Sequence, residues 1–235
     1  MASRPHVIFT VPKPPSAQQT RTNPDDTLSW IKARIHGLIA TIKGQTDPTG
    51  QLTISHDAYM IIYSVIHDVV AKHHAEKLYD FLGELLQKHC EDLRGEILEA
   101  AVNASNREYS IVESYATQWK LYRALAKIDA HLFSPLERTW ILRELDEQRG
   151  GRRRGRPVVY SVWDLHMIRW KQVVVTGSGP GQESENSESD SDEILAALTG
   201  ARDGKVYADV EDHDERAPKL LEDVTSSLSE IGLSS

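Results

Sequence analysis

The stretch Asp57–Val70, DAYMIIYSVIHDVV, decides the fold class. Its apolar and aromatic residues recur at helical spacing in two adjacent stripes. The first stripe holds Tyr59, Ile62, Tyr63, Ile66 and Val70, and the second holds Ile61, Val65 and Val69. One neighbouring helix cannot cover so wide an apolar arc, so we expect a helix with partners on more than one side. Ser55, just ahead of the stretch, is a suitable N-cap for it.

Helical periodicity also governs the sequence on both sides of this stretch. Further helices are expected at Asp25–Gly44, at about 75–93 with an extension towards Val102, from Asn106 towards Phe133, from Ser134 onwards, and at about 160–174. The helix from Ser134 is expected to use this serine as its N-cap and Pro135 in its first turn. No segment alternates at period two for long. The sequence therefore predicts an all-α helical bundle over residues 24–175.

The two ends of the chain differ from the bundle in composition. Residues 1–23 carry four prolines among Ser, Thr and Gln, which is typical of a flexible lead-in. The net charge of -8 is uneven, because residues 176–235 hold 15 of the 35 acids and only 4 of the 27 bases. The run Glu183–Glu193 alone has six acids and four serines. We therefore expect residues 1–23 to be a disordered lead-in and residues 176–235 to be an acidic, Ser-rich disordered tail.

The sequence does not carry the usual signatures of catalysis or of metal binding. Nucleotide-binding glycine loops, a serine-nucleophile elbow and a zinc-protease HExxH are all missing. Cys90 is the only cysteine, and the neighbours His73 and His74 would point about 100° apart on a helix, away from a common metal. We expect no enzyme activity, no cofactor, no metal and no small-molecule substrate. With no apolar run long enough for a membrane span, we expect no membrane partner and a cytoplasmic or nuclear location.

Six short segments, taken in order, resemble the N-terminal part of a cullin, the scaffold of modular ubiquitin ligases. They are Trp30–Ile39, Tyr59–Tyr63 (similar to Y-x-x-L-Y), Ala75–Tyr79 (similar to G-x-x-L-Y), Tyr115–Arg123 (similar to Y-x-x-x-W-x-x-Y), Leu136–Trp140 (L-[ND]-R-x-[WY]) and Val159–Trp170. The resemblance covers residues 24–175 and implies that they form one five-helix cullin repeat, the first. It implies a non-enzymatic scaffold that acts in ubiquitin-dependent protein degradation.

The resemblance also implies a binding surface for a substrate adaptor, either a Skp-type or a BTB-type protein. In the family this surface lies on the second helix and at the end of the fifth. Carried over position by position, the contacts would be Tyr59, Met60, Tyr63, His67, Ser134, Pro135 and Arg138. Two positions depart from the family pattern, since many members have Tyr where this chain has His67 and Tyr is common where it has Pro135.

Two questions stay open at the level of sequence. Five arginines fall within Arg149–Arg156, so the alternative function is a helical nucleic-acid-binding protein that uses this basic loop. The resemblance also stops before the RING-binding region of the family. We therefore expect either a short paralogue that competes for adaptors or an incomplete gene model.

Overall fold

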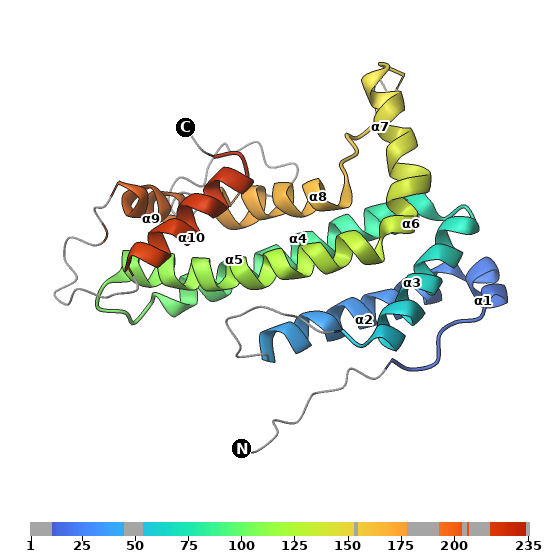
Figure 1. Cartoon of the computed structure of the whole chain (residues 1–235), viewed down its shortest axis with the longest axis horizontal. Coiled ribbons are helices and arrows are strands. Elements are labelled where there is room, and N and C mark those ends of the chain that lie inside the picture. The colour runs from blue at the N-terminus through green and yellow to red at the C-terminus, as the bar shows by residue number, and fades with distance from the viewer. Residues whose placement is uncertain are drawn as a thin grey trace. The chain divides into compact units, whose positions relative to one another are not determined.

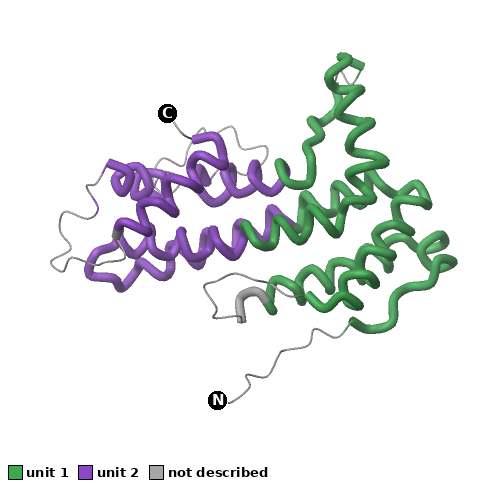
Figure 2. Tube along the Cα trace, in the orientation of Figure 1, with its two compact units in different colours: residues 1–85, 123–164 green, residues 86–122, 165–235 purple. Residues whose placement is uncertain are grey.

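The computed structural model describes residues 11–44, 54–152, 155–177, 193–203, 206 and 217–233. These residues form helices and turns and no strand, which confirms the all-α prediction (Figure 1). The chain divides into two compact units (Figure 2). Unit 1 comprises residues 1–85 and 123–164, and unit 2 comprises residues 86–122 and 165–235.

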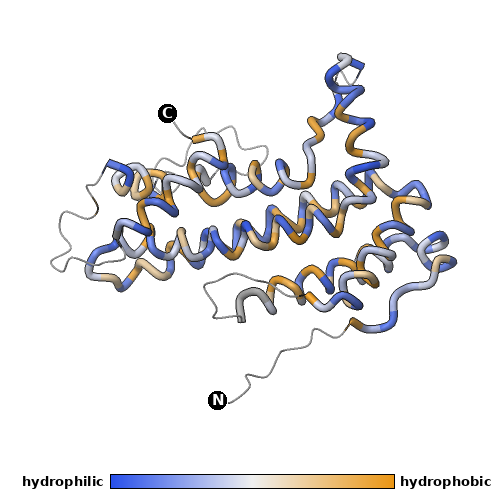
Figure 3. Tube along the Cα trace, in the orientation of Figure 1, coloured by the Kyte–Doolittle hydropathy of each residue, from blue (hydrophilic) through white to orange (hydrophobic). Residues whose placement is uncertain are grey.

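The long helices of unit 1 bury one apolar face each. The elements of this unit are α1 (Ala17–Thr22), α2 (Pro24–Gly44), α3 (His56–Ala71), the start of α4 (Ala75–Ala100), the end of α5 (Arg107–Leu132), α6 (Ser134–Leu136), the π-helix η1 (Glu137–Ile141) and α7 (Leu142–Arg149). The short α1 and α7, by contrast, bury only Thr20 and Glu144. In α2 the buried residues Leu28, Ile31, Ile35 and Leu38 follow the spacing of a single helical face. Figure 3 shows apolar and polar positions alternating along this helix.

The first helix lies within the segment expected to be a disordered lead-in. Ser16 and Gln19 form a capping box, in which the Gln19 N–H donates to Ser16 Oγ at 3.3 Å and the Ser16 N–H donates to Gln19 Oε1 at 2.8 Å. Thr20 is buried. The structure thus departs from the expectation at residues 17–22, because a local cap satisfies the first turn. Residues 1–10 lie outside the described part of the chain.

The two predicted N-caps have different outcomes. Ser55 caps α3 as expected, with its Oγ accepting the Ala58 N–H at 3.2 Å. The prediction for Ser134 is wrong, because Phe133 occupies the N-cap position of α6 and no side chain caps that end. The chain passes from α5 to α6 with only Phe133 between them, so the N–H groups of this turn find carbonyl partners in the preceding helix, as Phe133 does with Asp129 at 2.8 Å.

Unit 2 is centred on a cluster of aromatic rings. It contains the end of α4, the start of α5, most of α8 (Val162–Arg169), the π-helix η2 (Trp170–Val175), α9 (Glu193–Arg202) and α10 (Ala217–Glu230). The fully buried Trp170 ring lies 4.7 to 5.6 Å, centroid to centroid, from Tyr115, Trp119 and Tyr122. Trp170 Nε1 donates to the Tyr115 hydroxyl at 3.1 Å. These rings are the aromatic residues of two cullin-like segments, which therefore build the core of this unit.

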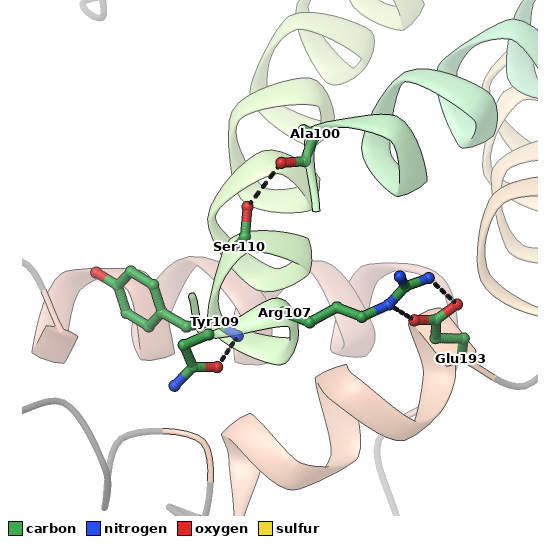
Figure 4. A network of polar contacts seen from close by, with 6 residues as sticks. Ala100, Arg107, Tyr109, Ser110 and Glu193 are labelled. Atoms are coloured by element: carbon green, nitrogen blue, oxygen red, sulfur yellow. Dashed lines mark hydrogen bonds and ion pairs between the residues drawn. The ribbon is translucent and has the colours of Figure 1, made fainter. Parts of the chain in front are cut away.

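Helices α9 and α10 fall inside the segment expected to be a disordered tail. Their buried residues include Ile194, Leu198, Val224 and Leu228. Figure 4 shows the Arg107 guanidinium of α5 facing the Glu193 carboxylate of α9, with one of the two hydrogen bonds at 3.0 Å. This contact holds the pKa of Glu193 below its usual value. The high average charge of the tail predicted disorder, with Ile194–Leu198 and Leu220–Leu233 as weakly apolar islands within it. Both islands find packing partners in unit 2, so the structure departs from the expected disorder at residues 193–202 and 217–230. The acidic residues 183–192 lie outside the described part.

Candidate functional site

Helix α3 buries one face and exposes parts of the other. Its buried residues are Ala58, Ile62, Val65, Ile66 and Val69. Met60 is 46% exposed, His67 is exposed, and Tyr59 and Tyr63 are half-buried. The helix therefore keeps aromatic and apolar surface outside the unit's own core, as the two stripes predicted.

Tyr59 and Tyr63 form a stacked pair on this partly exposed face. Their ring centroids are 6.0 Å apart, with 22° between the ring planes. The Tyr59 hydroxyl donates to the His131 carbonyl at the end of α5 at 3.2 Å. Burial and the neighbouring Tyr63 raise the pKa of Tyr59, against an opposing effect of the Arg138 charge. The hydrogen bond to α5 fixes Tyr59, and the stacking contact in turn restricts Tyr63.

A surface hollow of about 680 Å³ brings four of the seven predicted site residues together. Tyr63 and His67 come from α3, Pro135 from α6 and Arg138 from η1. The other lining residues are Val70, Ala71, His73, Ala75, Glu76, Thr139, Trp140 and Arg143. Tyr59, Met60 and Ser134 do not line the hollow. Of these three, Met60 is exposed while Tyr59 and Ser134 are half-buried.

One wall of the hollow is a π-helix that the sequence analysis did not anticipate. In η1 the Leu142 N–H donates to the Glu137 carbonyl, five residues back. Pro135 has no N–H to donate, and the Thr139 hydroxyl donates to the Pro135 carbonyl at 2.7 Å. Short π-segments occur frequently at functional sites. The proline that replaces the family's common Tyr was the one sequence signal for an irregular helix here.

The floor of the hollow is held by contacts between three cullin-like segments. The Trp140 ring lies 5.2 Å from the Tyr79 ring. The Tyr79 hydroxyl accepts the Tyr160 N–H at 2.9 Å, and Glu137 Oε2 accepts the Val162 N–H at 2.9 Å. Burial raises the pKa of Glu137, while the Val162 N–H opposes that shift. These contacts anchor η1 to the start of α8 and so fix the position of Arg138.

The basic loop after α7 is exposed where the structure describes it. The Arg149 side chain is 80% exposed and lies 3.9 Å from the Asp146 carboxylate. Arg152 and Arg156 are also exposed, and Gly151 and Gly155 adopt positive φ angles of 68° and 81°. Arg153 and Arg154 lie outside the described residues.

Neither a metal site nor a membrane span emerges from the described ranges. Within them, no group of three or more His, Cys, Asp or Glu residues is arranged to hold a metal ion. His73 and His74 sit in the turn between α3 and α4, and Cys90 is buried within α4. In the same ranges, every helix is too short or too polar to cross a bilayer.

Comparison with known proteins supplies the family. The sequence model described as the cullin alpha solenoid domain matches residues 43–235, most of the chain. The chain belongs to the cullin family. The matched region includes α9 and α10, and so runs past the boundary expected at residue 175.

Two curated cullins show how far the likeness extends. The chain is similar to Cullin-1 of Caenorhabditis elegans, with 32% identity over 97 residues, and to Cullin-1 of Dictyostelium discoideum, with 26% identity over 106 residues. These stretches cover 40% and 45% of this chain but only 11% and 12% of the two relatives. No solved structure matches the chain.

Proposed function

We propose that this chain is a non-enzymatic scaffold module of a ubiquitin ligase complex that binds a substrate adaptor of the Skp or BTB type. The observation that carries the proposal is the hollow in unit 1, where Tyr63 and His67 of α3 face the same space as Pro135 and Arg138. The α3 pair and the pair Pro135 and Arg138 are at least 68 positions apart in sequence, and all four are positions that the family resemblance assigns to adaptor contact.

The surface around the hollow has the character of a protein interface. Met60 is a large apolar side chain left 46% exposed, next to the stacked pair Tyr59 and Tyr63. Aromatic residues, Met and Arg are the residue types enriched in the cores of protein–protein interfaces. The proposed adaptor surface comprises Tyr59, Met60, Tyr63, His67, Ser134, Pro135 and Arg138, with the hollow at its centre. A scaffold of this kind acts in the cytoplasm or the nucleus.

Direct binding to purified adaptors tests the proposal. The full chain is titrated, in separate experiments, with a recombinant Skp-type protein and a recombinant BTB-fold protein, and heat is measured by calorimetry. Saturable one-to-one binding to either protein supports the proposal and identifies the adaptor class. No heat with either, and no co-elution on size exclusion, would reject it.

The exposed arginine loop supports a second candidate function, phosphate-based nucleic-acid binding. Arg149, Arg152 and Arg156 are exposed and lie outside the hollow. Binding through phosphates weakens steeply with salt, with a log–log slope of about -0.9 per contact on duplex DNA. A fluorescent DNA duplex that binds at low salt, and loses affinity when the three arginines become Gln, would favour this function. Adaptor binding by the same triple variant should be unchanged.

A further inference from the structure

We propose that Arg149 is a methylation site for an arginine methyltransferase that uses S-adenosylmethionine. The site is separate from the proposed function, because Arg149 lies outside the hollow and adaptor binding plays no part in its modification. Three observations carry the proposal: the sequence around Arg149, the exposure of its guanidinium, and the backbone that follows it.

The sequence places two glycines directly after Arg149, in the order Arg149-Gly150-Gly151. To be methylated, an arginine side chain has to enter the enzyme deeply enough for its guanidinium to reach the cofactor, and bulky neighbours hinder that entry. Glycine carries no side chain and adopts backbone conformations that other residues avoid. Among the described residues two arginines precede a glycine, Arg149 and Arg94, so the sequence alone offers two candidates.

The end of α7 presents Arg149 to solvent. Arg149 is the last residue of this helix, and its side chain is 80% exposed. Its Nη1 lies 3.9 Å from a carboxylate oxygen of Asp146, a side chain that is itself 79% exposed. A contact this long between two exposed groups is easily exchanged for another partner. Figure 2 shows the far end of α7 projecting beyond the other helices of unit 1, where an enzyme can approach it.

The backbone turns out of the helix immediately after Arg149. Gly150 is the C-cap of α7, and its N–H donates to the Asp146 carbonyl at 3.0 Å. Gly151 then adopts a positive φ of 68°. Apart from its chain neighbours, no heavy atom of the described residues lies within 4 Å of the place where a Cβ would stand on Gly151. The space beside Arg149 is therefore open on the side that the two glycines occupy.

Arg94 shares the Arg-Gly dipeptide but lies in the opposite surroundings. It is half-buried in the middle of α4, and Gly95 continues the helix. Arg94 Nη1 donates to the Val174 carbonyl at 2.7 Å. Methylation of Arg94 would require this hydrogen bond to break and the helix to open. The structure thus selects Arg149 from two arginines that the sequence does not distinguish.

The reaction balances with S-adenosylmethionine as the methyl donor. A guanidinium nitrogen of Arg149 gives its proton to a general base of the enzyme and attacks the S-methyl carbon. The carbon–sulfur bond breaks and its electron pair stays on sulfur, so the products are methylarginine, S-adenosylhomocysteine and a proton. Methylation keeps the positive charge of the guanidinium and removes a hydrogen-bond donor. It would therefore alter hydrogen bonding by the basic loop without changing its net charge.

Site-resolved methylation of the full chain tests the proposal. The protein is incubated with S-adenosylmethionine and a recombinant type I or type II arginine methyltransferase, in separate reactions, and methylated residues are located by tandem mass spectrometry. Arg94 is the internal control, because it offers the enzyme the same Arg-Gly dipeptide. We expect Arg149 to be methylated at least tenfold more than Arg94. Unmodified Arg149 with both enzymes, or equal methylation of the two arginines, would overturn the proposal.

The variant Arg149→Lys checks the assignment, because neighbouring arginines of the loop share proteolytic peptides with Arg149. Lysine keeps the positive charge at the end of α7 and has no guanidinium to methylate, and the variant should melt at the temperature of wild type. The methyl groups assigned to Arg149 should disappear from this variant. If they persist at the same level, they belong to another residue and the proposal fails, whereas the proposed adaptor binding is unaffected by either result.

Discussion

The Tyr79 hydroxyl clamps the backbone of Tyr160 through two hydrogen bonds. It accepts the Tyr160 N–H at 2.9 Å and donates to the Tyr160 carbonyl at 3.3 Å. The two residues are 81 positions apart, and both belong to segments that resemble cullins. The Tyr79 ring meanwhile packs on Trp140, the floor of the hollow. A single side chain thus joins the start of α4, the segment ahead of α8 and the candidate site.

Tyr79→Phe should destabilise the protein while keeping the ring contact with Trp140. The change removes the acceptor for a part-buried N–H, which costs about 1–3 kcal/mol of unfolding free energy. Chemical denaturation followed by circular dichroism measures this loss. Tyr160→Phe is the matched control, since only the backbone of Tyr160 takes part in the clamp, and it should unfold like wild type. Equal stability of Tyr79→Phe and Tyr160→Phe would contradict the clamp.

Glu137→Gln should change how stability depends on pH. Burial raises the folded-state pKa of Glu137 above its ordinary value of 4.5, so folding favours the protonated form. The contribution of the Glu137 carboxyl to folding stability is therefore complete below pH 4.5 and is lost as the pH rises through the raised folded-state pKa. Gln keeps an acceptor for the Val162 N–H but carries no charge. The unfolding free energy of Glu137→Gln, relative to that of wild type, should therefore rise as the pH goes from acid to neutral.

Denaturation midpoints of the two proteins across this pH range measure the effect. Glu137→Ala is the control for the hydrogen bond, and it should be less stable than Glu137→Gln at every pH, because the Val162 N–H loses its partner. If the unfolding free energy of wild type instead rises relative to that of Glu137→Gln as the pH rises, the surroundings stabilise the carboxylate, and the prediction is contradicted.

Leu198→Ala should show that α9 packs as part of the folded protein. Leu198 is fully buried, and removing such a side chain costs about 2–5 kcal/mol of unfolding free energy. Leu195, on the same helix but only half-buried, is the matched control, and Leu195→Ala should cost clearly less. Identical melting curves for both variants and wild type would instead indicate that this segment does not fold.

Sequence patterns predicted the helices where apolar spacing was regular and long. The stripes of Asp25–Gly44 and Asp57–Val70 became α2 and α3, and the break at 103–106 separates α4 from α5. In such segments the apolar side chains that define the helical spacing are also the ones that pack in the core, so the sequence alone is sufficient to predict the helix. The irregular segments were harder to predict. Pro135 indicated only that a helix starts there, whereas the π-helix η1 depends on which groups donate hydrogen bonds to the Pro135 and Glu137 carbonyls.

The tail and the candidate site show two further limits of sequence. The burial of Ile194 and Val224 depends on partners elsewhere in unit 2 that no local pattern contains. Tyr63 and Arg138 likewise line the same hollow only because of the tertiary fold. The resemblance to cullins suggested it, and composition and periodicity alone did not. Glu137 and Tyr79 were quoted only as parts of cullin-like segments, and their hydrogen bonds that support the site were not predicted, since their partners are backbone groups.

The central claim is that the exposed side of α3 is an adaptor-binding surface, and the double variant Met60→Ala/Tyr63→Ala tests it most directly. Ile66→Ala, on the fully buried side of the same helix, is the control. The measurement is the adaptor Kd by calorimetry, taken together with the melting temperature of each protein. We expect the double variant to lose about 2 kcal/mol or more of binding free energy while its melting temperature stays near that of wild type. Ile66→Ala should lose about 2–5 kcal/mol of folding stability and, below its melting temperature, still bind. A double variant that melts early, or that binds the adaptor as tightly as wild type, would contradict the account.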